Sequence, residues 1–84
     1  MSNIILSDHT RDMLKERNIL EEWVWRTINS PYRKKRRVDY DDNMHYLKPI
    51  KEREGRVLHV VVNPNVQPNR IVTVFFDRRA RKKK

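Results

Sequence analysis

The residue best suited to move a proton is His9, which stands where the first helix of the chain is expected to begin. The dipole at a helix N-terminus favours the neutral imidazole, and the neutral imidazole is the form that a general base needs. A histidine in this place can also do no more than cap or pack the start of the helix. The sequence leaves both interpretations of His9 open.

Three further side chains could act on a phosphate group. Arg17 could clamp a phosphate with two parallel hydrogen bonds, although pairing with Glu16 or with a carboxylate of the sheet is the favoured interpretation. Lys48 could stabilise negative charge on a scissile phosphate. Thr73 could hold a phosphate oxygen, although strand propensity alone explains a threonine there. Together with His9, these three are the candidate catalytic residues.

The remaining histidines and aromatic residues offer weaker signals. Tyr46 shares a strand face with Lys48 and could stack on a nucleic-acid base, but an ordinary amphipathic strand explains the pair equally well. His59 lies inside an apolar run, where a buried histidine with a hydrogen-bond partner is the commoner outcome. The three histidines, His45 included, lack the spacing of a metal site, so no metal or other cofactor is expected. The single glycine, Gly55, excludes a glycine-rich phosphate loop.

Positive charge is concentrated in two runs. Eleven of the 20 Lys and Arg residues lie in 33–37 and 78–84, and the formal net charge is +9. Such runs lower their free energy beside a polyanion because counterions are released, so RNA is the expected partner. A solvated surface run followed by a disordered tail is the alternative. The residues expected to bind nucleic acid are Arg33, Lys34, Lys35, Arg36, Arg37, Tyr46, Arg78, Arg79 and Arg81.

The length of the chain predicts one domain over residues 1–77, followed by a basic disordered tail over 78–84. No apolar stretch approaches the roughly 20 residues of a membrane span, and the N-terminus lacks the features of a signal peptide. The absence of cysteine excludes thiolate catalysis and fits a reducing compartment. These features predict a cytoplasmic protein without a membrane partner and leave its oligomeric state open.

Periodicity divides the chain into a helical half and a strand half. Apolar residues at three- and four-residue steps predict a helix from Ser7 or Asp8 to Arg17 and a second helix over about 20–29. Alternating or β-branched residues predict strands at 44–50, 57–62 and 71–76. The basic run within 32–39 and the apolar residues 4–6 could add edge strands.

The predicted fold is therefore α+β, with two N-terminal helices packed on a three- to four-stranded antiparallel sheet. The expected shared core consists of Leu14, Trp23, Val24, Ile28, Val60 and Ile71.

Short motifs follow one another along the chain in a particular order. They are Ile5-Leu6-Ser7-Asp8-His9, Met13, Glu16-Arg17-Asn18-Ile19, Glu21-Glu22, Val24, Asn29-Ser30-Pro31, Tyr46, Leu58 to Val62 and Ile71-Val72-Thr73-Val74. In this order they resemble the family called domain of unknown function 4258, over roughly residues 4–76. The chain departs from the family pattern at Asn18, where a glycine is usual, and at Leu20, where a capping Ser or Thr is usual. The resemblance implies a RelE-like fold, similar to the RelE and BrnT toxins and to small metal-independent ribonucleases.

The resemblance and the charge together favour an RNA-directed, toxin-like protein, with metal-independent endoribonuclease activity as its enzymatic form and an antitoxin as a protein partner. In that reading the 2′-OH of the RNA attacks the adjacent phosphate. His9 exchanges the proton, Arg17 and Lys48 stabilise the charge, and Thr73 holds an oxygen. Two alternatives remain open: a non-catalytic module that binds RNA, DNA or the ribosome, and a protein-interaction domain whose face includes Trp25.

Overall fold

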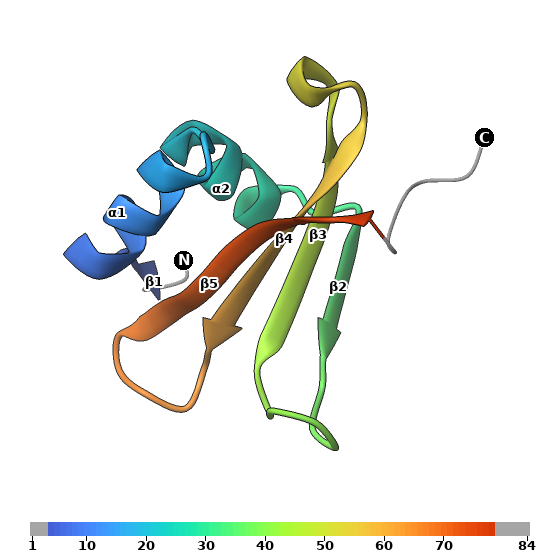
Figure 1. Cartoon of the computed structure of the whole chain (residues 1–84). Coiled ribbons are helices and arrows are strands. Elements are labelled where there is room, and N and C mark those ends of the chain that lie inside the picture. The colour runs from blue at the N-terminus through green and yellow to red at the C-terminus, as the bar shows by residue number, and fades with distance from the viewer. Residues whose placement is uncertain (1–3, 79–84) are drawn as a thin grey trace.

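The computed structural model describes residues 4–78, which form two α-helices and a five-stranded sheet. In chain order the elements are β1 (Ile4–Ile5), α1 (Asp8–Glu16), α2 (Glu21–Asn29), β2 (Arg33–Arg36), β3 (Met44–Ile50), a short 3₁₀ helix (Lys51–Arg53), β4 (Arg56–Asn63) and β5 (Asn69–Asp77). Figure 1 shows the two α-helices together on one side of a twisted sheet. The predicted α+β class is confirmed.

Local residue chemistry explains where the helices begin and end. The Ser7 side chain accepts a hydrogen bond from the Thr10 backbone N–H at 3.2 Å and so caps α1. Asn18 takes the left-handed conformation, with φ at 57°, in the turn between the helices. Leu20 precedes α2 and supplies no side-chain cap, but Glu21 and Glu22 in the first turn suit the positive end of the helix dipole.

The sheet has the strand order β1-β5-β4-β3-β2 and is mixed. The strands β2 to β5 pair antiparallel, whereas β1 pairs parallel with β5 through Ile4 opposite Asn69. The expectation of a three- to four-stranded antiparallel sheet was therefore wrong in strand number and in strand direction. The apolar residues 4–6 did suggest an edge strand, but a two-residue strand does not reveal its direction or its partner, and β5 lies near the other end of the described residues. The basic run does form an edge strand, β2, as the charge pattern suggested.

One core fills the space between the helices and the sheet. Val24 of α2 and Val60 of β4 have no exposed surface, and all six residues predicted for the core are buried. Polar contacts fasten α1 to β5: the Thr10 hydroxyl donates to the Ile71 carbonyl at 3.4 Å, and Arg17 Nη1 donates to the Val74 carbonyl at 2.8 Å. One face of the sheet is therefore used for packing.

Two smaller points complete the fold. Trp25 is half-buried, packs against the core, and donates its ring N–H to Glu21 at 3.1 Å, so it covers the edge of the core. Neither α-helix within residues 4–78 has the length and apolar character needed to cross a bilayer.

Candidate functional site

Two histidines meet on the face of the sheet that turns away from the helices. Along β3 and β4, side chains alternate between the two faces, and Tyr46 and Val60 belong to the helix-covered core. His45 and His59 are their direct neighbours in sequence and therefore face the other way. Because His45 pairs with Val61 and Leu47 pairs with His59, the two imidazoles lie diagonally across neighbouring strands.

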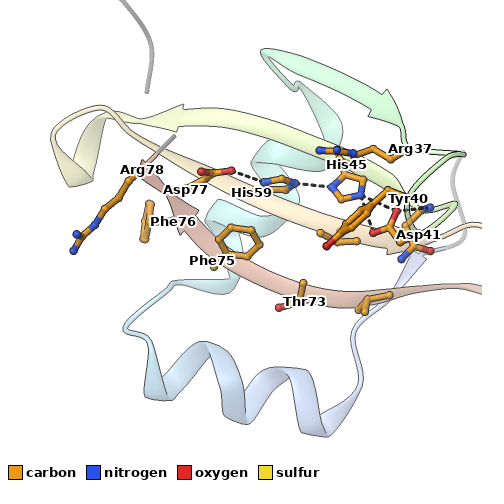
Figure 2. A pocket seen from close by; sticks show the side chains of 13 residues that line it. Arg37, Tyr40, Asp41, His45, His59, Thr73, Phe75, Phe76, Asp77 and Arg78 are labelled. Atoms are coloured by element: carbon orange, nitrogen blue, oxygen red, sulfur yellow. Dashed lines mark hydrogen bonds and ion pairs between the residues drawn. The ribbon is translucent and has the colours of Figure 1, made fainter. Parts of the chain in front are cut away.

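The histidines form the middle of a hydrogen-bonded chain of four side chains, which we call the relay (Figure 2). His45 Nδ1 lies 2.7 Å from His59 Nε2. At one end, His45 Nε2 lies 3.0 Å from Asp41 Oδ2, and at the other end, His59 Nδ1 lies 2.9 Å from Asp77 Oδ2. All four ring nitrogens are therefore engaged.

Burial and aromatic contacts hold the relay in place. The exposed fractions of His45 and His59 are only 5% and 8%. The Phe75 ring, on β5, stacks on the His59 ring with centroids 4.8 Å apart, and the two imidazoles meet edge to face at 4.9 Å. Aromatic packing of this kind fixes ring orientation in addition to burying area.

The relay has one contact more than two neutral imidazoles can fill with their own protons. Three hydrogen bonds join the four groups, and each needs one proton between its two heavy atoms. Two neutral imidazoles carry only two protons. A third proton would complete the chain and make one imidazole an imidazolium, next to two carboxylates that would balance its charge. The histidine pair can therefore take up and share one extra proton.

Two groups of the relay, His59 and Asp41, have lowered pKa values. Burial lowers the pKa of His59, and the positive charge of His45 acts in the same direction, while the hydrogen bond to Asp77 opposes both. At Asp41 burial opposes ionisation, but the hydrogen bonds from His45 and from the Asn43 backbone outweigh it, so the pKa of Asp41 is lowered. The carboxylate thus stays ionised beside the pair.

A tight turn between β2 and β3 positions Asp41. The Arg37 carbonyl accepts hydrogen bonds from the backbone N–H groups of Tyr40, Asp41 and Asp42, at 3.1, 3.1 and 2.8 Å. Arg36 forms an ion pair with Asp42 at 3.0 Å. Backbone hydrogen bonds to the Arg37 carbonyl and the ion pair of Asp42 therefore stabilise the turn. The backbone of this turn places the Asp41 carboxylate next to His45.

The relay borders an open pocket of about 710 Å³. Basic side chains at its border are Arg37 and Arg78, and its aromatic lining includes Tyr40 and Phe75. The Arg37 guanidinium lies 5.1 Å from the centroid of the Tyr40 ring. Among residues 4–78, no group of three or more His, Cys, Asp or Glu side chains is arranged to hold a metal ion.

The basic edge strand β2 runs beside this pocket. Lys35 pairs with His45 and Arg33 with Leu47, and directly paired residues of antiparallel strands share a face, so both point to the pocket side. Lys34 points to the helix side, where its Nζ lies 5.4 Å from the Tyr46 ring. All four side chains of β2 are exposed. A strip of positive charge therefore leads to the relay.

The structure does not bring the four candidate catalytic residues together. His9 is exposed in the first turn of α1, and Arg17 is bonded to the Val74 carbonyl. Lys48 Nζ donates to the Ser30 carbonyl at 2.7 Å. Thr73 lines the pocket, but its hydroxyl donates to the Met13 sulfur at 3.7 Å. Arg17 and Lys48 thus fasten the fold together.

The residues expected to bind nucleic acid divide into three groups. Arg33, Lys34, Lys35, Arg36 and Arg37 are exposed on or beside β2, and Arg78 borders the pocket. Tyr46 is buried in the core, where burial raises the pKa of its phenol, so its ring offers no free face to a base. Arg79 and Arg81 lie outside the described residues.

His45, Asp41 and Asp77 were not predicted as site residues from the sequence. A hydrogen-bonded histidine was expected at position 59, and it is confirmed. The sequence did contain an indication of this pair. Strand alternation places His45 on the face opposite Tyr46 and His59 on the face opposite Val60, so both histidines face away from the core. Nothing local indicated that a turn carboxylate and a strand-end carboxylate would close the relay.

A family model described as "Domain of unknown function (DUF4258)" matches residues 6–76. No curated protein and no solved structure matches the chain. The likeness to the RelE and BrnT toxins and the existence of an antitoxin partner therefore stay predictions.

Proposed function

The chain belongs to the DUF4258 family, and we propose that it acts on RNA, which it binds along β2 and cleaves without a metal ion in the pocket beside His45 and His59. The observation that carries this proposal is the relay itself, a hydrogen-bonded chain of two histidines and two carboxylates at an open pocket next to a strip of positive charge. Titratable groups with perturbed pKa values in a cleft mark candidate functional sites.

The charge distribution supports a polyanionic substrate. Arg33 and Lys35 face the pocket side of the sheet, and Arg37 continues the same strip into the pocket lining. Each lysine or arginine that contacts a phosphate releases condensed counterions, which favours binding. A strand of RNA laid along β2 would bring its backbone to the relay.

The reaction that fits the pocket is transesterification within the RNA. The 2′-oxygen forms a bond to the adjacent phosphorus, and the bond from phosphorus to the 5′-oxygen breaks. The 2′-OH loses its proton to a base, and the departing 5′-oxygen receives one. The products are a 2′,3′-cyclic phosphate and a free 5′-OH, and the step needs no other reactant.

The relay can supply the base. When the pair holds two protons, one tautomer arrangement has His45 Nδ1–H donating to His59 Nε2 and His59 Nδ1–H donating to Asp77. Both protons then point toward Asp77, and His45 Nε2 carries a free lone pair. A 2′-OH that takes the place of Asp41 at this nitrogen would give up its proton there. Asp41, next to the resulting imidazolium, would stabilise its charge.

Arg37 is the group placed to stabilise negative charge on the phosphate. It lines the same pocket as the relay and is a neighbouring positive charge that lowers the pKa of His59, after burial and the charge of His45. A guanidinium can donate two parallel hydrogen bonds to phosphate oxygens as charge develops in the transition state.

The test is incubation of the purified protein with total RNA in the presence of a metal chelator. His45→Ala should lose about 10²–10⁴-fold in cleavage rate, the range typical of general acid–base catalysis. His9→Ala is the matched control and should cleave at the wild-type rate, because His9 lies outside the pocket lining. Asp41→Asn, a change in the exposed turn, keeps the test valid if His45→Ala unfolds. Intact RNA with wild-type protein at every pH tested would overturn the enzymatic proposal.

A non-catalytic RNA-binding module is the second candidate. It is favoured by the engagement of all four ring nitrogens and by the small exposed fractions of both histidines. Salt-dependent RNA binding without cleavage would support this candidate.

A further inference from the structure

Tyr40 is an unusually exposed aromatic side chain at the border of the pocket. Its exposed fraction is 76%, the highest among the large hydrophobic residues that are exposed within residues 4–78. A single exposed apolar side chain is common and by itself means little. The surroundings of Tyr40 give it more weight, because it lines the same pocket as the relay.

The backbone that carries Tyr40 is fixed. Its N–H donates to the Arg37 carbonyl at 3.1 Å, within the turn that the same carbonyl organises through three hydrogen bonds. Asn65 donates to Asp42 Oδ2 at 3.1 Å and ties this turn to the loop between β4 and β5. A ring presented by an anchored turn loses little further freedom when it binds a ligand, which favours binding.

The chemistry around the ring suits a flat, electron-rich ligand. The Arg37 guanidinium lies over the Tyr40 ring, 5.1 Å from its centroid, so a planar cation and an aromatic ring are already in cation–π contact. Nucleic-acid bases stack on tyrosine rings and on guanidinium planes alike. Tyr40 also directly precedes Asp41, which bonds His45. A nucleotide stacked on Tyr40 would therefore have its sugar near the relay.

We infer that Tyr40 is a stacking platform for one unpaired base, and that the pocket consequently takes single-stranded RNA and not duplex RNA. In a duplex the base faces are already stacked on one another and cannot cover the Tyr40 ring. The inference rests on the proposed action on RNA and adds its substrate class. It also moves the stacking role from the buried Tyr46 to an exposed residue of the turn.

The test compares equilibrium binding of three probes at one salt concentration. The first is a short single-stranded RNA with 2′-O-methyl sugars, which cannot undergo transesterification. The second is an abasic strand of equal length and charge, and the third is the duplex of the first. The protein variants are Tyr40→Leu, which removes the aromatic ring, and Tyr40→Phe, which keeps it. Both leave the net charge and the backbone hydrogen bond of the turn unchanged.

Tyr40→Leu should bind the base-bearing strand about 5- to 150-fold more weakly than wild type, the range expected for one base–aromatic stack. Tyr40→Phe should bind like wild type. The abasic strand and the duplex should not distinguish Tyr40→Leu from wild type. Proton resonances of the Tyr40 ring should move upfield with the base-bearing strand and not with the abasic strand.

Two results would overturn the inference while leaving the action on RNA intact: equal binding of the base-bearing strand by wild type and Tyr40→Leu, or an equal loss for the abasic strand. If wild type binds none of the three probes, the proposed function fails, and the inference fails with it.

Discussion

His45 Nδ1 and His59 Nε2 lie 2.7 Å apart on neighbouring strands, a separation that requires a proton between them. Both rings are almost completely buried, so each depends on the other and on its carboxylate for hydrogen bonding. Carboxylates close the chain at both ends, so the two histidines titrate as coupled sites. Measurable consequences for stability follow from this coupling.

Removing one ring should leave the other without its buried partner. His59→Ala deprives His45 Nδ1 of its hydrogen bond and removes one hydrogen bond of Asp77, and leaving a buried polar group unsatisfied costs about 1–3 kcal/mol. Urea denaturation near neutral pH measures the loss of unfolding free energy. His9→Ala is the control, because exposed substitutions change stability by only about 0.5 kcal/mol. Equal stability of the two variants would contradict the proposed coupling.

Stability should fall as the pH drops below neutrality because of His59. Burial lowers its pKa below the ordinary value of 6.5, so between these two values the unfolded chain binds more protons than the native chain. The contribution of His59 to the unfolding free energy is therefore complete above 6.5 and is lost as the pH falls toward the lowered pKa. Denaturation curves between about pH 7.5 and 5 should show this slope. The slope should flatten in His59→Gln, and an unchanged slope in that variant would assign the effect to another group.

The core can be tested with one substitution at two sites. Val24→Ala should lower the unfolding free energy by about 1–3 kcal/mol, because Val24 has no exposed surface and packs between α2 and the sheet. Val38→Ala makes the same chemical change where 67% of the side chain is exposed, and it should alter stability by no more than about 0.5 kcal/mol. Chemical denaturation of both variants measures the two changes in unfolding free energy. A Val24→Ala protein as stable as Val38→Ala would contradict the packing of α2.

The two faces of β2 should differ in their contribution to RNA binding. Lys35 faces the pocket side, whereas Lys34 lies over the Tyr46 ring on the helix side. Lys35→Gln should reduce the slope of log affinity against log salt by about 0.7, the value for one lost phosphate contact on a single strand. Lys34→Gln removes the same charge and should leave the slope nearly unchanged. Equal changes in the two variants would show that RNA does not approach from the pocket side.

The helices and the core were predictable because the sequence patterns that specify them lie within a few residues of one another. The three- and four-residue spacing of apolar side chains defines the buried stripe of α1 and α2, and Ser7 and Asn18 act at short range. The pairing of β1 with β5 joins two residues near one end of the described chain to a strand near the other end. No local pattern specifies such a register, and for this reason the mixed sheet was missed.

The candidate site was less predictable than the fold. The charge of β2 and the hydrogen-bonded state of His59 could be anticipated from composition and from the rule that buried polar groups find partners. The relay depends on Asp41 in a turn and on Asp77 at the end of β5, and their approach is set by tertiary structure. His9 was predicted as a proton-exchanging residue because it lies at a helix N-terminus. The helix dipole acts only over the first turn, so it does not indicate whether a residue lies in a pocket.

The parallel pairing of β1 with β5 also bears on when the fold can form during synthesis. The first elements of the chain depend on the last strand: Ile4 pairs with Asn69, and Arg17 bonds the Val74 carbonyl. Until β5 has been made, α1 and α2 have an incomplete sheet to cover, and their apolar stripes remain open to water and to chaperones. Contacts between distant parts of a chain form slowly, so the domain must acquire its native packing late and as a unit.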